Sequence, residues 1–574
     1  MREFETSEPP HSRGKCSNYL FSSEINKFRF WAAVFSRGEI DELAVRLTLS
    51  ALPDPPLLAA RLHDVHVEAQ TFIGDIDGIR QTTKRLLFLV PTNALARSRG
   101  HERRRHNGNV EFMRGKQHDK GMQTGDKEPI MTEPIADASI YLWGREVATV
   151  SWSADDGFAV FRYTPEFAAT GVELSPLVMP LSGDPYSFPA LPRTTFKGLP
   201  GMLADALPDR FGDQLINAWL AEQARTPESF NPVERLCYLG AQGMGALEFR
   251  PALAVCDRKA RSVEVVALVR MVNQLLNEKT GSESVNSMVR AARHAPDAFD
   301  DILRVGTSAG GARAKAILAW NSKTGEFRHG QTDAGDGFEH WLMKLDGIDN
   351  NRDKEEPDPQ GFGQIEYGYH LMATAAGIDM MPCRLHHEGG RSHFMTRRFD
   401  RTIDENGATH KLHMQSLCGL QHFDFNDPIS YSYEQAIMTI RNLGLGTRAL
   451  EQQFLRAAFN IIARNQDDHV KNIAFLMDQS GAWALSPAFD VTYSYNPRGE
   501  WTGQHQMSLN GKRDGFELAD LFSFAENASI KPARARALVS SVRDVVANWL
   551  HHADEAGIDR ETAHRIGSAH RLVP

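Results

Sequence analysis

The chain has 574 residues, of which 41% are hydrophobic and 24% are charged, and its formal net charge is -9. A chain of this size can bury a large core, and its length favours about three or four structural units. The net negative charge excludes broad binding to a nucleic-acid backbone as the main activity, because such binding needs a cationic surface.

The cysteines and the apolar runs indicate the cellular compartment. The five cysteines are widely spaced and contain no Cys-x-x-Cys pair, which favours a reducing compartment over a zinc or dithiol centre. The longest early apolar run, residues 86–90, ends at Pro91 and is far shorter than the ~20 residues that cross a bilayer. We therefore expect a cytoplasmic protein without a signal peptide or membrane span.

Residues 1–130 differ from the rest of the chain. They contain proline clusters and a basic stretch around Arg103, Arg104 and Arg105, with little sustained helical or strand period. We expect this segment to be poorly ordered, as a flexible basic leader or as translated upstream sequence before a true start at Met131. DNA binding by the arginine run is a third interpretation, although short charge runs are more often solvated tails.

Residues 131–295 are expected to form a β-rich N-terminal subdomain. Apolar alternation predicts a hairpin over residues 140–152 and a further strand over residues 158–163. A helix is predicted from Gln214 onward. Asp205 and Asp209, beside Pro and Gly, are expected to cap and turn the chain before that helix rather than to act in catalysis.

A loop of small residues precedes an apolar strand at residues 305–320. Glycines let backbone N–H groups approach an anion closely, and such loops commonly cradle phosphates. The loop lacks the Gly-Lys-Ser/Thr ending of a Walker loop, so taken alone it also fits an ordinary tight turn. In the context of the residues that follow, we expect five of its members to bind ATP, namely Thr307, Ser308, Ala309, Gly310 and Gly311.

Two charged residues follow in an order typical of kinases. Lys344 is embedded in an apolar strand pattern, where kinases place the lysine that contacts the nucleotide phosphates. Glu366 is predicted in the first turn of a helix over residues 364–377, from which it could orient Lys344 through an ion pair. The alternative for Glu366 is a favourable interaction with the helix dipole alone.

Residues 465–490 have the layout of a phosphotransferase site. Asp467 is followed five residues later by Asn472, and a predicted hairpin then leads to Asp490. We expect Asp467 to align or accept the proton of an attacking hydroxyl, while Asn472 and Asp490 supply the oxygen ligands that Mg²⁺ prefers. In the same catalytic segment, His469 is expected to fix the loop by hydrogen bonding. Asp468 is expected to face outward or to act as a cap.

Other motifs receive structural interpretations. Pairs of histidines such as His386 with His387 and His551 with His552 lack the spacing of a zinc site, and no metal is assigned to them. An apolar stripe over residues 533–550 predicts a closing helix that packs on the large lobe. Binding of a partner by that helix is the alternative.

Several of these segments together resemble the HipA family. They are residues 306–315, 339–347, 397–401, 465–472, 487–490 and 508–512, with residues 199–212 and 239–249 nearer the N-terminus. The resemblance implies an α+β fold with a β-rich N-terminal subdomain at 131–295, a kinase region at 296–525 and a helical closing segment at 526–574. It leaves residues 1–130 unexplained.

The same resemblance implies an activity and partners. Members of the family are ATP- and Mg²⁺-dependent serine/threonine protein kinases that act as toxins of type II toxin-antitoxin systems. A helix-turn-helix antitoxin similar to HipB would hold the toxin in check and would alone contact operator DNA. An aminoacyl-tRNA synthetase is the implied substrate class.

The family's functional residues fall on positions already singled out. Asp467 is similar to the catalytic Asp, Asn472 and Asp490 to the metal ligands, and Lys344 to the ATP lysine. Ser308 stands where the family has its autophosphorylation serine.

The glycine-rich loop departs from the family in one place. Arg313 replaces the glutamine that is often found two residues before Lys315, and Thr307 adds a second hydroxyl beside Ser308. Two alternatives stay open: a catalytically idle, nucleotide-sensing subunit that binds a DNA-bound antitoxin, and a small-molecule kinase.

Overall fold

The computed structural model describes residues 134–253, 260–276, 296–307, 313–331, 334–348, 361–405 and 407–572, together with strands nearer the N-terminus. The chain divides into two units, residues 1–124 and 125–574. In the first unit, β1 (Ser17–Ser22), β2 (Phe28–Arg37), β3 (Ile40–Leu49) and β4 (Leu87–Phe88) form one sheet in that order.

The first unit contains strands in a stretch where the sequence shows little sustained strand period. In it, β2 and β3 pair antiparallel over ten residues each. Both strands are rich in aromatic and aliphatic residues, which favour extended structure. The interpretation of residues 1–130 as a leader or a mis-assigned start stays a prediction.

The second unit begins with a four-stranded antiparallel sheet in the order β7-β6-β5-β8. Its strands are β5 (Asp137–Leu142), β6 (Arg145–Ser153), β7 (Phe158–Tyr163) and β8 (Leu247–Arg250). Ala138, Ile140 and Leu142 alternate into the core. Trp143 and Gly144 link β5 to β6 with positive φ at both positions, the backbone of a tight hairpin turn. The predicted hairpin and third strand are confirmed.

Helices α4 (Gly201–Ala206), α5 (Arg210–Glu222) and α6 (Pro232–Leu239) complete this N-terminal part. Helix α6 begins with a capping box in which Asn231 and Glu234 exchange hydrogen bonds. Helix α5 begins four residues before the predicted start at Gln214, and buries Phe211 and Leu215 against the core that α9 also joins.

A five-stranded antiparallel sheet in the order β10-β9-β11-β13-β12 occupies the middle of the chain. Its strands are β9 (Lys315–Trp320), β10 (Phe327–His329), β11 (Glu339–Lys344), β12 (Cys383–Glu388) and β13 (Arg391–Arg397). Trp341 and Met343 pack into one core with α7 (Val265–Leu276) and α9 (Pro296–Gly306). Because side chains alternate along a strand, Lys344 points to the opposite face of the sheet. Helix α10 (Phe362–Ala375) brings Glu366 to this side chain.

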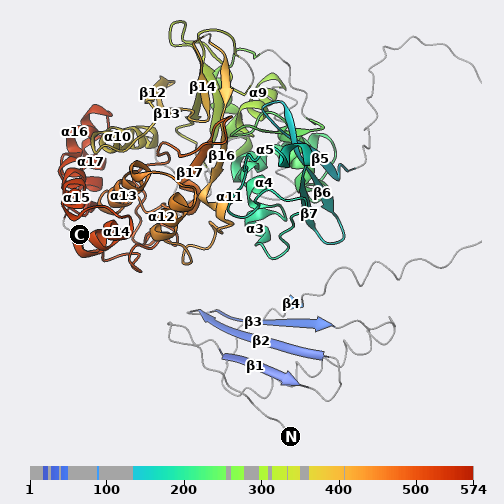
Figure 1. The fold of residues 1–574 in the computed structure, drawn as a ribbon. Helices are drawn as coiled ribbons and strands as arrows, with labels where there is room; N and C mark the ends of the chain where they lie inside the picture. The colour runs from blue at the N-terminus through green and yellow to red at the C-terminus, as the bar shows by residue number, and fades with distance from the viewer. Residues whose placement is uncertain are drawn as a thin grey trace, which may run out of the picture. The chain divides into compact units, whose positions relative to one another are not determined.

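The C-terminal lobe is mostly helical. It contains α12 (Tyr433–Asn442), α13 (Thr447–Ile462), α14 (Leu518–Asn527), α15 (Pro532–Ala547), α16 (Trp549–Glu555) and α17 (Arg560–Ala569). Figure 1 shows these helices, coloured orange to red, at the opposite side of residues 125–574 from strands β5 to β7. The predicted closing helix is present as α15 followed by α16, and Leu538, Val542 and Trp549 join the main core.

A small three-stranded sheet, β16-β17-β18, carries the candidate catalytic segment. Strands β16 (His413–Ser416), β17 (Ala474–Met477) and β18 (Trp483–Leu485) pair antiparallel, so the hairpin predicted between Asn472 and Asp490 is confirmed. The 3-10 turn η3 (Val470–Asn472) ends one residue before β17 begins, and α11 (Leu417–Gln421) follows β16.

The remaining elements are short. They are α2 (Pro165–Ala168), α3 (Arg193–Phe196), η2 (Pro227–Ser229), β14 (Arg401–Ile403) and β15 (Thr409–Lys411). Within the described ranges, no helix is both long and apolar enough to cross a membrane. The α+β class with a β-rich N-terminal part and a helical C-terminal lobe is confirmed, while the domain boundaries at 130, 295 and 525 stay predictions.

Candidate active site

Lys344, Glu366 and Asp490 meet in one cluster although they come from three separate elements. The Nζ of Lys344 lies 2.6 Å from Oε1 of Glu366 and also donates to Oδ1 of Asp490. The side chain of Lys344 is 12% exposed and that of Glu366 is 3% exposed, so little solvent screens the ion pair. The predicted Lys344–Glu366 pair is present, but α10 begins at Phe362, which puts Glu366 in the second turn rather than the first.

The neighbouring charges favour the ionised forms of Lys344 and Asp490. Burial alone would raise the pKa of Asp490, but the lysine charges of Lys344 and Lys315 outweigh it and hold that pKa well below its usual value. Burial alone would lower the pKa of Lys344, but the carboxylates of Asp490 and Glu366 have the larger effect and raise it. The cluster is therefore a fixed arrangement of charge in which Lys344 and Glu366 are buried and Asp490 is partly exposed.

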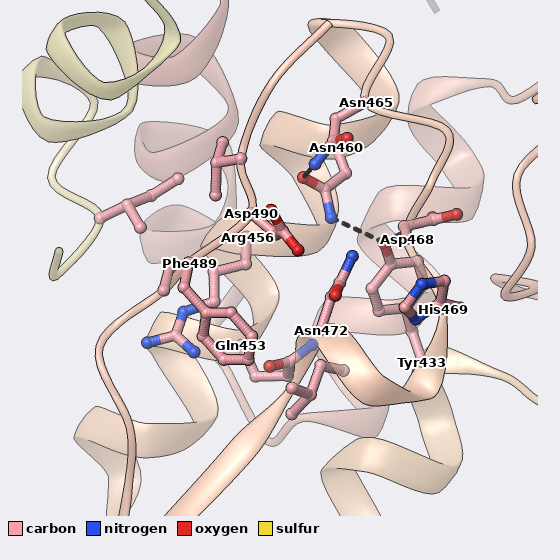
Figure 2. Close-up of a pocket in the computed structure, with 14 residues that line it drawn as sticks. Tyr433, Gln453, Arg456, Asn460, Asn465, Asp468, His469, Asn472, Phe489 and Asp490 are labelled. Atoms are coloured by element: carbon pink, nitrogen blue, oxygen red, sulfur yellow. Dashed lines mark hydrogen bonds between the residues drawn. The ribbon is translucent and has the colours of Figure 1, made fainter. Parts of the chain in front are cut away.

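The backbone around Asp490 is held from two sides. Arg456 of α13 donates from its guanidinium to the carbonyl of Ser486 at 2.7 Å, and Ala488 donates its N–H to the carbonyl of Asp379 at 2.8 Å. Asp490 itself has φ +56°, in the left-handed region that Asp adopts more readily than bulky residues. This turn presents its carboxylate to the pocket shown in Figure 2, where Asn472 lies nearby.

The catalytic segment forms a short turn closed by its own hydrogen bonds. The side-chain amide of Asn472 donates to the backbone carbonyl of Asp467 at 2.8 Å. Since the nitrogen end of the amide is used in this way, its oxygen end would be the ligand if a cation bound. The carboxylate of Asp467 accepts from the amide of Gln506 at 2.7 Å and is 46% exposed. It is therefore oriented yet open to an external hydroxyl.

Asp468 does not face outward, and that expectation is wrong. Its carboxylate is buried and accepts hydrogen bonds from the Tyr433 hydroxyl at 2.6 Å, His505 Nδ1 at 2.7 Å and the N–H of Gln506 at 2.8 Å. Burial would raise its pKa, but His505 and the other donors outweigh this and lower it. Asp468 anchors the segment to the lobe, because a buried carboxylate is stable only when fully hydrogen-bonded.

His469 fixes the turn as expected. Its Nδ1 accepts the N–H of Lys471 at 3.3 Å, and its Nε2 lies 3.8 Å from Oδ1 of Asp467. Among the described residues, no group of three or more His, Cys, Asp or Glu side chains could hold a metal by itself. The set of Asn472 and Asp490 is nevertheless the kind that suits Mg²⁺, which is commonly held by one or two carboxylates together with substrate phosphates.

The structure adds Lys315 and Gln506 to the candidate site. Lys315 is buried and lies directly opposite Lys344 in the β9–β11 pair. Burial lowers the pKa of Lys315, and the nearby Asp490 carboxylate opposes this shift. A lysine directly after a small-residue loop was a signal for Lys315, whereas no local pattern marks Gln506.

The small-residue loop is only partly described. Residues Ser308, Ala309, Gly310 and Gly311 lie outside the described residues, so their predicted contacts with ATP stay predictions. Thr307 is buried at the end of α9, where its Oγ1 donates to the carbonyl of Leu303 at 2.8 Å. The loop therefore begins after Gly306 rather than at residue 305, because α9 continues through the apolar Val305.

The expectation for Asp209 also needs correction. Asp209 is the residue before α5, but its side chain makes no capping hydrogen bond to that helix. Instead it forms an ion pair with Nζ of Lys471 in the catalytic segment. Sequence reasoning missed this role because 262 residues separate the partners.

In this fold, a β-rich N-terminal domain packs against a lobe that carries the cluster of Lys344, Glu366 and Asp490. The same lobe carries the turn from Asp467 to Asn472. The HipA N-terminal domain matches residues 138–250, and the HipA-like C-terminal domain matches residues 307–549. These two matches together span more than half of the chain. The chain belongs to the HipA family.

Two relatives illustrate the similarity. The provisionally named kinase Y4mE of Sinorhizobium fredii (strain NBRC 101917 / NGR234) is 25% identical over 205 residues, which are 33% of this chain and 47% of Y4mE. The chain thus matches about half the length of that curated relative. The HipA of Shewanella oneidensis MR-1, solved as a complex with HipB and operator DNA, has a TM-score of 0.52 at 17% identity. The match covers 75% of this chain and 94% of that one, and it shows a shared fold.

Proposed function

We propose that the protein is an ATP- and Mg²⁺-dependent serine/threonine protein kinase. The observation that carries this proposal is the ion pair of Lys344 with Glu366 at 2.6 Å, with Asp490 on the same ammonium group. A strand lysine held by a helix glutamate, beside a metal-binding aspartate, is the charge arrangement that kinases use to hold nucleotide phosphates. The name of the relative Y4mE also supports a kinase activity.

Each residue has a role that its surroundings support. Lys344 would contact the phosphates of ATP, and Glu366 would hold Lys344 in place. Asn472 and Asp490 would supply oxygen ligands to Mg²⁺, which neutralises phosphate charge when it is bound. Asp467, held by Gln506 and open to solvent, would orient the acceptor hydroxyl and take up its proton.

The biological setting follows from the family. We propose that the chain is the toxin of a type II toxin-antitoxin system and that a helix-turn-helix antitoxin binds it. The solved relative from Shewanella is a complex of HipA with HipB and operator DNA, which supports a partner of this kind. An aminoacyl-tRNA synthetase is the proposed substrate class, and Ser308 is the proposed site of autophosphorylation. A phosphate there would add nearly two negative charges beside the proposed ATP phosphates and would repel them.

The first experiment incubates the full chain with Mg²⁺ and γ-labelled ATP and locates the label by mass spectrometry. Asp467→Asn keeps the shape of the side chain and removes its charge, so the rate of label transfer should fall by at least about 10²-fold, as expected for loss of a general base. Asp554→Asn, an exposed acid on α16, is the matched control. If ATP binds but no label is transferred with any acceptor, the idle nucleotide-sensing subunit becomes the better hypothesis.

A further inference from the structure

The N-terminal domain contacts the catalytic segment through residues of α4 and of the turn before α5. The Nζ of Lys471 donates to Oδ1 of Asp209, and both side chains are largely buried, at 17% and 21% exposure. Burial would lower the pKa of Lys471, but the carboxylates of Asp209 and Asp205 outweigh it and raise that pKa. Asp209 therefore holds the side chain of Lys471 through an ion pair that little solvent screens.

A second carboxylate from the same stretch holds the end of the catalytic segment. Asp205 accepts the N–H of Ser416 at 2.6 Å and its hydroxyl at 2.7 Å. The next residue, Leu417, donates its N–H to the carbonyl of Ile473 at 2.7 Å. Asp209 thus holds the segment at Lys471, and Asp205 holds it through β16 at the residue that follows Asn472.

Movement of Lys471 would be transmitted to the groups with proposed catalytic roles. The backbone N–H of Lys471 donates to His469 Nδ1, and the N–H of Asn472 donates to the carbonyl of His469 at 2.9 Å. The side chain of Asn472 then returns to the carbonyl of Asp467. These bonds form one small turn, so the position of Lys471 and the orientation of Asn472 are linked.

Close backbone packing fixes the N-terminal stretch against the lobe. Gly201 donates its N–H to His422 Nε2 at 3.0 Å. A Cβ at Gly201 would lie 2.4 Å from the carbonyl oxygen of Gly419, and a Cβ at Gly419 would lie 2.8 Å from Cβ of Asp205. Helices α4 and α11 therefore touch without room for side chains between them, which leaves Asp205 and Asp209 little freedom to move.

We propose that Asp209 is a positioning residue for phosphoryl transfer, through which the N-terminal domain completes the kinase site. It acts through Lys471, which holds the turn that carries Asn472. This inference rests on the proposed kinase function. It means that the N-terminal domain is part of the catalytic machinery and not only a platform for binding partners.

The test compares Asp209→Asn with Asp213→Asn in the full chain. Asp213 lies four residues along the same stretch and pairs with Arg235 inside the N-terminal domain, so it controls for loss of a charge on α5. We expect Asp209→Asn to lower kcat for labelled ATP about tenfold, the size of effect that coupled neighbouring groups show, with KM for ATP changed by less than about twofold. Asp213→Asn should leave both unchanged, and Asp209→Glu should restore part of kcat.

A double-mutant cycle separates positioning from general stability. If Asp209 acts through Lys471, adding Asp209→Asn to Lys471→Met should lower kcat no further, whereas independent losses multiply. The inference would be overturned if the double variant showed the product of the two single losses in kcat. Equal kcat for Asp209→Asn and Asp213→Asn would also overturn it.

Hydrogen exchange provides a readout that does not depend on activity. Amides of residues 467–473 should exchange about tenfold faster in Asp209→Asn than in Asp213→Asn, because the turn has lost its anchor. Equal exchange in the two variants would overturn the positioning role. If the protein without substitutions transfers no phosphate, the proposed kinase function is wrong. The hydrogen-exchange comparison of the two variants would still decide whether Asp209 positions the turn.

Discussion

Lys315 and Lys344 lie directly opposite each other on strands β9 and β11, and both attract the carboxylate of Asp490. Opposed residues of an antiparallel pair have side chains on the same face of the sheet, so two cations are placed together on the face where Glu366 lies. Like charges at such positions repel each other, and the carboxylates of Glu366 and Asp490 offset that repulsion. The arrangement places two lysine side chains beside two carboxylates where the phosphates of ATP and Mg²⁺ are proposed to bind.

The first prediction concerns Lys344. Lys344→Met should lower kcat/KM for ATP on the order of 10²-fold, the usual cost of removing one group that stabilises charge in the transition state. Lys323→Met, which changes an exposed lysine in the turn after β9, should have no effect. The measurement is the initial rate of label transfer from ATP, with circular dichroism to verify folding. Equal rates for the two variants would argue against the assigned role of Lys344.

The second prediction concerns acid stability and Asp468. Burial would raise the pKa of this carboxyl, but His505 and the other hydrogen-bond donors have the larger effect. The pKa is therefore lower in the folded protein than its ordinary value of 3.8. A carboxyl with a lowered folded pKa contributes stability that is fully present above the unfolded pKa and is lost as the pH falls through the folded pKa. In Asp468→Asn, Tm should be lower at neutral pH, and its decline between about pH 5 and pH 2 should be shallower.

The check is Tm measured by circular dichroism across that range. Asp467→Asn is the control, because the neighbouring carboxylate is 46% exposed and contributes little to packing. If Tm declines equally with falling pH in Asp468→Asn and in the protein without substitutions, the carboxylate of Asp468 does not cause the loss of stability in acid.

Much of the candidate site could be predicted because its signals are local. The spacing from Asp467 to Asn472, the hairpin that leads to Asp490 and the lysine within an apolar strand are all visible in short windows of sequence. Strand alternation and helical periodicity place such residues on their elements, and the order of the elements then indicates which side chains meet. The ion pair between Lys344 and Glu366 was predicted in this way and is present.

The rest depends on contacts between distant parts of the chain. Whether Asp468 faces solvent or the core is decided by Tyr433 and His505, which lie 35 and 37 residues away from it. The pairing of Asp209 with Lys471 requires the N-terminal domain to dock on the lobe, and no periodicity encodes that docking. Local propensity made a cap the natural expectation for Asp209, and tertiary contact overrode it.

The third prediction concerns a buried charge cluster that joins the N-terminal domain to the lobe. Asp400 is fully buried and accepts from Arg398 at 2.7 Å, Arg401 at 2.8 Å and the N–H of Gly245 at 2.7 Å. Asp400→Ala would leave two buried guanidinium groups without their shared carboxylate, which should reduce the free energy of unfolding by about 3–5 kcal/mol. Urea denaturation measures this loss. Arg448→Ala, which breaks an exposed pair with Asp379, should be indistinguishable from the unchanged protein.

The last prediction concerns the glycine contact between α4 and α11. Gly201→Ala would place a Cβ 2.4 Å from the carbonyl oxygen of Gly419 and 2.4 Å from Cδ2 of His422, so one helix must move away from the other. We expect a loss of about 1–3 kcal/mol in the free energy of unfolding, typical of overpacking. Because the same packing fixes Asp205, the amides of residues 467–473 should also exchange faster.

Gly183→Ala is the matched control, since a Cβ at Gly183 meets no atom within 4 Å. It should be neutral or slightly stabilising, because alanine restricts the unfolded chain. Urea denaturation and hydrogen exchange measured on both variants provide the comparison. A Gly201→Ala protein as stable as Gly183→Ala would mean that α4 and α11 can separate at no cost, and that the N-terminal domain does not hold the catalytic segment rigidly.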